Sequence, residues 1–298
     1  MEATALSSLR GTVGLWTATL DSVPPMRAVQ LAQEIEDLGY PSLWFPEAWG
    51  REAFTQAALL LSVTTRLTVA TGIANIWARD AVATRNAART LAAASRDRFV
   101  LGLGVSHQPL VERLRGHAYA SPLAHLREYL EAMDAVPMHA YEAETPVPVV
   151  LAALGPRMLH LAGERTAGAF TYLVTPEHTA VARSALGDAF LVVEQAVVLG
   201  QDRATYLERA HAHLDFYTGL TNYRNNWARL GFTEADWVRG GSEALCEALV
   251  AHVDLEGGRE VVARHRAAGA DHVLLQVLGE GAEPPLEEWR RLAEGFTG

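Results

Sequence analysis

The chain has no lysine: all 25 residues counted as Lys or Arg are arginines. Without a lysine amine, Schiff-base chemistry, lysine-anchored pyridoxal phosphate and a P-loop phosphate site are excluded. Cysteine is nearly absent as well, because Cys246 is the single one and cannot form a disulfide within the chain. Basic charge is scarce, and the net charge of −10 argues against a nucleic-acid partner, which needs a basic surface.

Long hydrophobic runs are also missing. No apolar run is long enough to cross a bilayer, and the start Met1-Glu2-Ala3-Thr4 lacks the basic and apolar parts of a signal peptide. Together with the single cysteine, these absences predict a soluble cytoplasmic protein with no membrane partner. The chain of 298 residues, 49% of them hydrophobic, is nevertheless long and apolar enough for a large core.

Apolar runs and amphipathic stretches alternate along the chain, which predicts strands alternating with helices. The predicted strands are Thr12–Thr17, Ser42–Phe45, Leu67–Gly72, the run from Phe99, Pro148–Ala152, Gly168–Leu173, Phe190–Val198 and His272–Val277. Later in the chain, the segment from Asp202 to roughly Leu230 is predicted to be strongly helical, and Ser242–Val253 is predicted as a further helix. Eight strands with helical connections predict a (β/α)8 TIM barrel, forming one domain over residues 1–298. The competing fold is a doubly wound sheet, whose usual glycine-rich first turn is missing at Leu15–Ala18.

The stretch Arg98–Pro109 predicts the floor of an active site. It starts as a buried strand and ends in the small and polar residues Gly104, Ser106 and His107. Ligands of barrels bind where the parallel strands end. A dinucleotide fingerprint is a weak alternative because its third glycine is absent, and a nucleophile elbow has Gln108 where it needs glycine. A plain strand-end hydrogen bond is the structural alternative for Ser106 and His107.

The predicted strand ends form an apolar and aromatic rim, which suits a flat organic ligand. The rim lacks clustered His, Asp and Glu, so no metal site is predicted. His211 and His213 do not share a helix face, and both are predicted at the surface. Asp80 is predicted as a helix cap. The patch around Tyr223 is predicted as packing or a subunit interface, with the lining of a pocket as the less common alternative.

Gly155-Pro156-Arg157, directly after Leu154, predicts a phosphate seat at a helix N-terminus, although a proline in the first turn is also structurally ordinary. Glu47 ends a predicted strand. It has two interpretations of similar weight: a carboxylate that stabilises the next helix, or a group that binds a cofactor ring or moves a proton.

Several segments in this order resemble the luciferase-like family, specifically its deazaflavin (coenzyme F420)-dependent oxidoreductases. The segments are Leu43–Arg51, Ala70–Ile76 with Ala78–Asp80, Phe99–His107, Arg115–His117 and Asn222–Phe232. The resemblance implies a barrel whose cofactor lies at the C-terminal rim, with a non-proline cis peptide near Gly72-Ile73. It also implies that Gly155 holds the cofactor phosphate, that Ser106 and His107 lie beside the cofactor ring or its side chain, and that the protein is a homodimer.

The predicted function is hydride transfer between F420 and a small organic substrate. The alternatives are an FMN-dependent monooxygenase on the same scaffold and a relative that binds a flavin or ligand without turnover. The sugar-phosphate dehydrogenases of the family carry Asp-His where this chain has Glu47-Ala48, so that substrate class is not expected. Glu47 and His107 are the predicted proton-transfer residues. The predicted cofactor contacts are Trp16, Gly72, Ile73, Asn75, Ser106, Leu154, Gly155 and Arg157.

Overall fold

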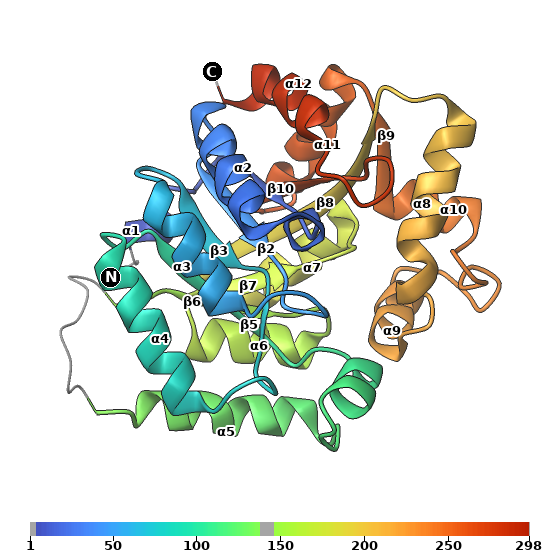
Figure 1. The fold of residues 1–298 in the computed structure, drawn as a ribbon. Coiled ribbons are helices and arrows are strands. Elements are labelled where there is room, and N and C mark those ends of the chain that lie inside the picture. The colour runs from blue at the N-terminus through green and yellow to red at the C-terminus, as the bar shows by residue number, and fades with distance from the viewer. Residues whose placement is uncertain (1–3, 138–145, 298) are drawn as a thin grey trace.

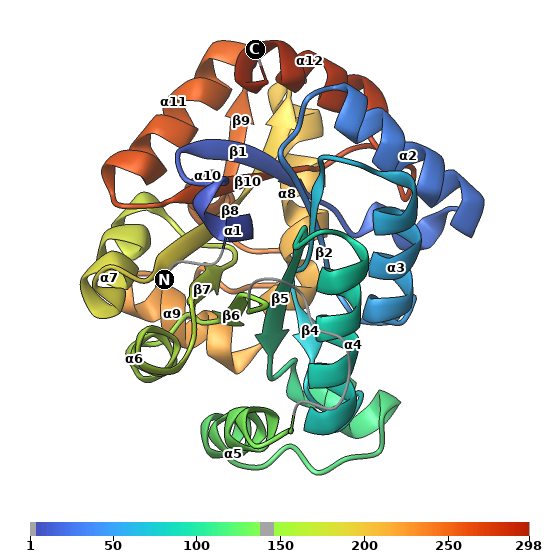
Figure 2. The same cartoon turned by 90° about the vertical axis from the view of Figure 1, so that its left-hand side faces the viewer.

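Eight parallel strands close into a barrel in the computed structural model, which describes residues 4–137 and 146–297 (Figure 2). The barrel strands are β1 (Thr12–Trp16), β2 (Ser42–Phe45), β3 (Thr68–Thr71), β5 (Phe99–Gly104), β6 (Val149–Ala152), β7 (Gly168–Thr171), β8 (Phe190–Leu199) and β10 (His272–Val277). Strand β10 pairs in parallel with both β1 and β8, which joins the two ends of the sheet. The predicted (β/α)8 TIM barrel is therefore confirmed.

Helices surround the barrel and connect its strands (Figure 1). The outer helices are α2 (Pro25–Asp37), α3 (Ala53–Val63), α4 (Ala81–Ala94), α5 (Pro122–Asp134), α6 (Pro156–Arg165), α7 (Pro176–Leu186), α11 (Leu255–Ala267) and α12 (Leu286–Phe296). Short 3-10 and π-helical turns lie at Thr19–Ser22 and Leu110–Leu114. As predicted, Asp80 caps α4, where its carboxylate accepts the N–H of Ala83 at 2.8 Å.

Three elements differ from the sequence-based prediction. The segment Asp202–Leu230 forms two helices, α8 (Arg203–Tyr217) and α9 (Thr221–Arg229). The predicted helix Ser242–Val253 is wrong in its last third: α10 (Glu243–Leu249) is followed by strand β9 (Val250–Val253), which pairs with β8. The β-branched valines at both ends of β9 favour this extended conformation. A two-residue strand, β4 (Ala74–Asn75), pairs with β5.

The core has two parts, on the two sides of the sheet. Between the sheet and the outer helices lies a cluster that includes Leu15, Leu43 and Leu275. The second cluster runs from Leu6 of α1 (Thr4–Ser7), through the barrel interior, to the side chains of α8 and α9. In Figure 2, α1 lies in front of the sheet and α8 behind it, so the two close opposite ends of the barrel.

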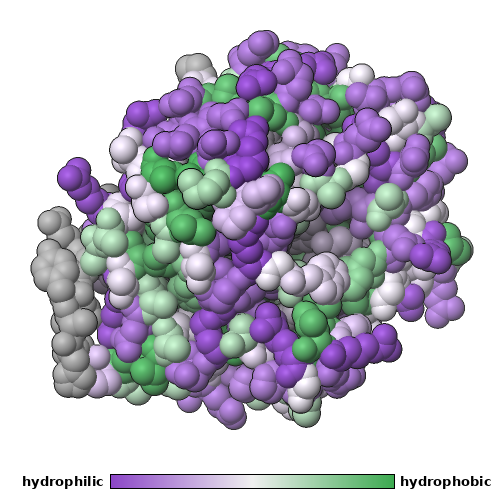
Figure 3. Space-filling model, viewed as in Figure 1, coloured by the Kyte–Doolittle hydropathy of each residue, from purple (hydrophilic) through white to green (hydrophobic). Residues whose placement is uncertain are grey.

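The outer surface is mixed in character. On the face shown in Figure 3, hydrophobic residues occur in small groups among hydrophilic ones. Among the described residues, no helix is both long and apolar enough to span a membrane.

Candidate active site

The end of β5 is shaped by close approach of the last residue of β3 and of the segment that follows it. A Cβ on Gly102 would lie 2.0 Å from the Thr71 carbonyl oxygen, and one on Gly104 would lie 2.7 Å from Ile73 Cδ1. Side chains at these two positions would push the segment away, so only glycine permits this contact. The two glycines of the stretch predicted as the floor therefore let the Ile73 side chain pack onto it.

The Gly72-Ile73 peptide bond is cis, as the family resemblance implied. Trp16 Nε1 donates a hydrogen bond to the Gly72 carbonyl at 2.8 Å, and a Cβ on Gly72 would lie 2.9 Å from that same Nε1. Trp16 is itself buried. Three residues predicted to contact a cofactor, Trp16, Gly72 and Ile73, thus lie together at the C-terminal end of the barrel.

Glu47 is buried and its carboxylate is fully occupied. It forms a bidentate ion pair with the guanidinium of Arg79 and accepts the N–H of Asn75 at 2.8 Å. The N–H of Ala53, at the start of α3, lies 3.4 Å from the same carboxylate. These contacts connect the end of β2, the cis-peptide segment and the starts of α3 and α4. They agree with the structural role predicted for Glu47, which stabilises the next helix, and they also place Glu47 close to the rim.

Ser106 and His107 follow β5 at the rim. Ser106 has a left-handed backbone, with φ of 54°, and its carbonyl accepts the hydroxyl of Tyr119 at 3.2 Å. The His107 ring contacts the rings of Phe216 and Tyr223, with centroids 5.9 and 5.8 Å away. Burial lowers the pKa of His107 to about 4, and its buried Nδ1 meets no hydrogen-bond partner in the described chain.

Helices α8 and α9 place an aromatic roof over the barrel end. The roof consists of Tyr217, Phe216 and Tyr223, and its underside meets Tyr172, which follows β7. The Tyr172 ring lies 5.1 Å from that of Trp16, so the roof and the cis-peptide region form one continuous aromatic lining. Tyr223 was predicted mainly as packing or a subunit interface. Its place in this lining is the less common alternative, which the sequence did not favour because α9 is distant in sequence from β1 and β5.

Hydrogen bonds connect the phenols of this lining. Tyr217 Oη donates to Tyr172 Oη at 3.2 Å, and Tyr172 Oη donates to Gln276 Oε1 at 2.8 Å. His213 Nε2 lies 3.5 Å from Tyr172 Oη, and burial lowers the pKa of His213 to about 4. The prediction of a surface His213 is wrong, because α8 turns this face toward the barrel rather than to solvent.

Glu194 is a buried acid that sequence reasoning missed. It lies on β8, is 0% exposed, and accepts the N–H of Leu173 at 3.1 Å through Oε2. Its Oε1 has no hydrogen-bond partner among the residues described, and burial raises the pKa of the carboxyl to about 8. A glutamate inside an otherwise apolar strand was the signal that could have identified it.

The N-terminus of α6 faces an arginine that the sequence did not point to. Gly155 precedes α6 without a side-chain cap, and a Cβ built on it would lie 3.6 Å from Nη2 of Arg229. Arg157, the predicted phosphate partner, is exposed on the first turn. His178 Nε2 lies 2.8 Å from the carbonyl of Leu154, a predicted cofactor contact, and burial lowers the pKa of His178.

Two buried polar side chains beside this N-terminus lack partners within the described residues: His178 at Nδ1, and Asn226 at both amide atoms. Asn226 lies on α9 between Tyr223 of the roof and Arg229, and all three residues are separated by three positions, which places them along one side of the helix. Unpartnered buried amides are rare in folded proteins. The side of α9 that brings Arg229 to Gly155 therefore also carries a polar group suited to a ligand.

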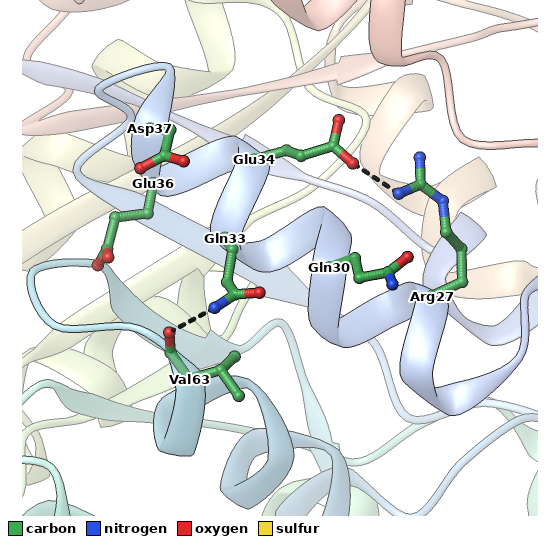
Figure 4. Close-up of a pocket in the computed structure, with 7 residues that line it drawn as sticks. All are labelled: Arg27, Gln30, Gln33, Glu34, Glu36, Asp37 and Val63. Atoms are coloured by element: carbon green, nitrogen blue, oxygen red, sulfur yellow. Dashed lines mark hydrogen bonds and ion pairs between the residues drawn. The ribbon is translucent and has the colours of Figure 1, made fainter.

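A separate depression of about 450 Å³ lies on the outside of α2, lined by Arg27, Gln30, Gln33, Glu34, Glu36, Asp37 and Val63 (Figure 4). Arg27 and Glu34 pair with each other, and Gln33 donates to the Val63 carbonyl. This open polar surface lies outside the barrel and contains none of the predicted site residues. In the described ranges, no three His, Cys, Asp or Glu side chains gather as a metal site.

The family model named luciferase-like monooxygenase matches residues 9–245, most of the chain. The chain belongs to the luciferase-like monooxygenase family. Among curated proteins, this luciferase-like chain is 36% identical over 157 residues to a Mycobacterium tuberculosis protein named as a coenzyme F420-dependent oxidoreductase. It is 26% identical over 179 residues to the 5,10-methylenetetrahydromethanopterin reductase of Methanolobus tindarius. These matches cover 52% and 54% of this chain, and 42% and 54% of the relatives, so the chain spans about half of each.

Solved structures share the fold of this luciferase-like chain. The F420-dependent tetrahydromethanopterin reductase of Methanopyrus kandleri has a TM-score of 0.72 at 16% identity, covering 94% of this chain and 96% of that one. An F420-dependent secondary alcohol dehydrogenase scores 0.74 at 15% identity, covering 96% and 98%. The FMN-bound 3,6-diketocamphane monooxygenase component of Pseudomonas putida scores 0.71 at 13% identity, covering 95% and 96%.

Proposed function

We propose that this protein binds coenzyme F420 at the C-terminal end of the barrel and transfers a hydride between it and a small organic substrate. The names of the first curated relatives, an F420-dependent oxidoreductase and a methanopterin reductase, support this assignment within the family. When bound, a deazaflavin supplies two-electron hydride chemistry, and the protein orients it and excludes water.

The observation that carries the proposal is the anion seat at Gly155. The start of α6 offers a backbone N–H without a capping side chain, and the Arg229 guanidinium stands over the same glycine. A helix N-terminus and a guanidinium both attract a phosphate diester. His178 and Asn226 add unpartnered polar atoms nearby, so the residues of this chain fit a cofactor with a phosphate and a polar tail.

In this proposal the flat cofactor ring lies along the lining between the anion seat and the cis-peptide segment. Trp16, Ile73 and Tyr172 offer apolar and aromatic surfaces, while His107 offers the unpartnered Nδ1 at the rim. Of the two residues predicted for proton transfer, Glu47 is tied to Arg79 and in this proposal positions Asn75 beside the ring. In this proposal His107 lies beside the cofactor ring and forms a hydrogen bond with the bound ligand.

The experiment is equilibrium binding of F420 and of FMN, each added alone to the purified protein and followed by ligand fluorescence. We expect micromolar or tighter binding of F420 and at least tenfold weaker binding of FMN. Tight binding of FMN alone would replace the proposal with an FMN-dependent monooxygenase, for which the FMN-bound structural neighbour offers a fold precedent. F420 binding without turnover of any tested substrate would favour a non-catalytic relative.

A matched pair of arginine variants tests the anion seat. Arg229→Gln removes the guanidinium beside Gly155, and Arg157→Gln removes an exposed one from the first turn of α6. Because a charge-assisted hydrogen bond contributes about 1.5–3 kcal/mol, we expect Arg229→Gln to weaken F420 binding about 10- to 100-fold. Arg157→Gln should stay within about twofold by the same free-energy scale. Equal effects of the two substitutions would contradict the seat.

A further inference from the structure

Four polar side chains in and under the roof carry hydrogen-bonding groups that the proposed cofactor site does not use, since that site draws only on the ring of Tyr172. We call this group the hydroxyl cluster: Tyr172, Tyr217, His213 and Gln276. Its members come from α8, from β10 and from the residue after β7. Tyr217 Oη donates to Tyr172 Oη at 3.2 Å, Tyr172 Oη donates to Gln276 Oε1 at 2.8 Å, and His213 Nε2 lies 3.5 Å from Tyr172 Oη.

The direction of these bonds leaves one proton available to a ligand. The Gln276 carbonyl oxygen can only accept, so the Tyr172 proton is committed to it. The Tyr217 proton points only at another hydroxyl, which a ligand oxygen can replace at little cost. Tyr172 is buried, whereas Tyr217 is half-buried at the edge of the lining. Tyr217 is therefore the donor that can turn toward a bound molecule.

The hydroxyl cluster carries no charge at neutral pH. Burial raises the pKa of Tyr217 to about 12 and lowers that of His213 to about 4. Glu194, close enough to interact electrostatically with Tyr172 and Tyr217, has a pKa raised to about 8 and is mainly protonated as well. None of the cluster's hydrogen bonds involves a cationic side chain, so a carboxylate or phosphate would lose its hydration without gaining a counter-charge.

We propose that the hydroxyl cluster is the substrate subsite for an uncharged carbonyl or alcohol oxygen, and that Tyr217 exchanges a proton with that oxygen. This inference rests on the proposed hydride-transfer function. Aromatic rings flank the donor: Tyr223 lies 5.0 Å and Phe216 5.4 Å from Tyr217, centroid to centroid. They supply the apolar surface that the hydrocarbon part of such a substrate requires.

The proposed step balances in electrons and atoms. A carbonyl carbon accepts the hydride of the proposed reaction, and its π-electron pair moves to the oxygen. That oxygen takes the Tyr217 hydroxyl proton, so the substrate leaves as an alcohol while the cofactor is oxidised by two electrons. The Tyr217 phenolate regains its proton from water at the half-buried edge. An alkoxide is a much stronger base than a phenolate, so the proton moves in the favourable direction.

His107 is the competing donor at the same rim. Its ring is 5.8 Å from Tyr223, on the side of β5 rather than of β7. With its pKa lowered to about 4, His107 carries no imidazolium proton at neutral pH. A neutral imidazole gives up a proton less readily than a phenol. The proton donor is therefore Tyr217, and the role of His107 is to contact the ligand.

The experiment compares Tyr217→Phe with Tyr206→Phe, in F420-loaded protein. Tyr206 is a matched control because it lies on the same helix and donates to the Val250 carbonyl at 3.0 Å, outside the lining. Saturation-transfer NMR measures binding of a panel of cyclic ketones headed by cyclohexanone, each paired with its carboxylate analogue such as cyclohexanecarboxylate. Steady-state rates are then measured on the ketones that bind, from pH 5 to 10. Melting temperature and F420 affinity establish that each variant is folded and loaded.

We expect ketones to bind at least tenfold more tightly than their carboxylate analogues. Tyr217→Phe should lower kcat about 100-fold with KM changed less than about threefold, the size usual for loss of a general acid. In alcohol oxidation, the wild-type rate should rise with pH and the Tyr217→Phe rate should not. Tyr172→Phe, which removes the acceptor of Tyr217, should lower kcat less, by about tenfold.

Three results would overturn the inference: no ketone of the panel binds, carboxylates bind as well as ketones, or Tyr217→Phe behaves like Tyr206→Phe. Each is distinct from failure of the proposed function, which would appear earlier as absence of F420 binding by the wild-type protein. A loss of kcat in His107→Gln with a normal Tyr217→Phe would assign the proton to His107 instead.

Discussion

The two ends of the barrel treat their buried polar groups in opposite ways. At the N-terminal end, Ser42 Oγ lies 2.7 Å from His272 Nε2, and Thr12 Oγ1 lies 3.0 Å from His272 Nδ1. Gly14 makes room for this group, since a Cβ there would lie 2.1 Å from Ser42 Oγ. The carboxylate of Glu36 is likewise satisfied, by the backbone N–H groups at the start of β3.

At the C-terminal end, unpartnered atoms cluster instead. Buried atoms of His107, His178, Glu194 and Asn226 lack hydrogen-bond partners within the described part of the chain. Asp97 and Trp289, which lie away from this end, also have unpartnered buried atoms. The two ends therefore differ in how closely such atoms cluster, and not simply in how many there are. A satisfied polar group stabilises the fold, whereas an unsatisfied one costs free energy until a ligand pairs with it. We therefore expect the polar groups of the N-terminal end to stabilise the fold and those of the C-terminal end to bind a ligand.

The largest expected effect comes from breaking the satisfied end. His272→Ala leaves a cavity and removes one hydrogen-bond partner from each of Ser42 and Thr12, so the free energy of unfolding should fall by about 3 kcal/mol or more. Denaturant unfolding at pH 7 measures this. F420 affinity of the folded variant should stay within about twofold, a free-energy change below about 0.5 kcal/mol. A loss of less than about 1 kcal/mol would mean that this end is not where the stability lies.

The pH dependence of the two ends sharpens the comparison. The pKa of Glu194 is raised to about 8 from 4.5, so the folded state binds the proton more tightly than the unfolded one. Its contribution to stability is therefore lost as pH rises from 4.5 through 8. Glu194→Gln removes this loss, and at pH 9 it should be more stable than wild type by at least about 2 kcal/mol. Parallel stability curves from pH 5 to 9 would contradict the prediction.

His272 responds in the opposite direction. Burial lowers its pKa to about 4 from 6.5, so stability is lost as pH falls from 6.5 through 4. The wild-type free energy of unfolding should thus decline on both sides of a pH maximum. In His272→Ala, the decline toward acid pH should be smaller than in wild type. The pKa values of His107, His213 and His265 are lowered to about 4 as well, so these residues contribute to the same acid decline. His272→Ala should therefore reduce the decline rather than abolish it.

The smallest effect on stability is expected at Asn226. Asn226→Leu replaces an unpartnered buried amide by an apolar group of similar size, so the free energy of unfolding should change by less than about 1 kcal/mol. F420 affinity should nevertheless fall about tenfold, which corresponds to about 1.4 kcal/mol. Thermal unfolding and F420 titration give the two numbers. A strongly destabilised variant with normal F420 binding would reverse the comparison at this position.

Local patterns in the sequence were sufficient for the barrel. The ranges of β2 and β10 agree with prediction to the residue, because turn residues bound each apolar segment. Prediction failed at Val250–Val253, where the apolar pattern of α10 continues into a strand. Only pairing with β8, a partner distant in sequence, selects the extended form there.

The candidate site was predictable only in part, for a related reason. Residues at strand ends, such as Trp16, Gly72 and His107, follow from the order of the strands, and they lie together as expected. Arg229 and Tyr217 belong to α8–α9, whose placement depends on packing across the barrel end. No local pattern states which rim residue a roof helix will contact, so those two were missed.

The pairing of β8 with β9 also bears on how new specificities arise. Residues 200–249, which carry the whole roof, leave the sheet after Leu199 and return to it at Val250, on two hydrogen-bonded neighbouring strands. This segment can therefore be replaced, lengthened or shortened while the strands of the barrel keep their register. A laboratory recombination of roofs between relatives needs only these two junctions, and descendants of one ancestral barrel could diversify in the same manner.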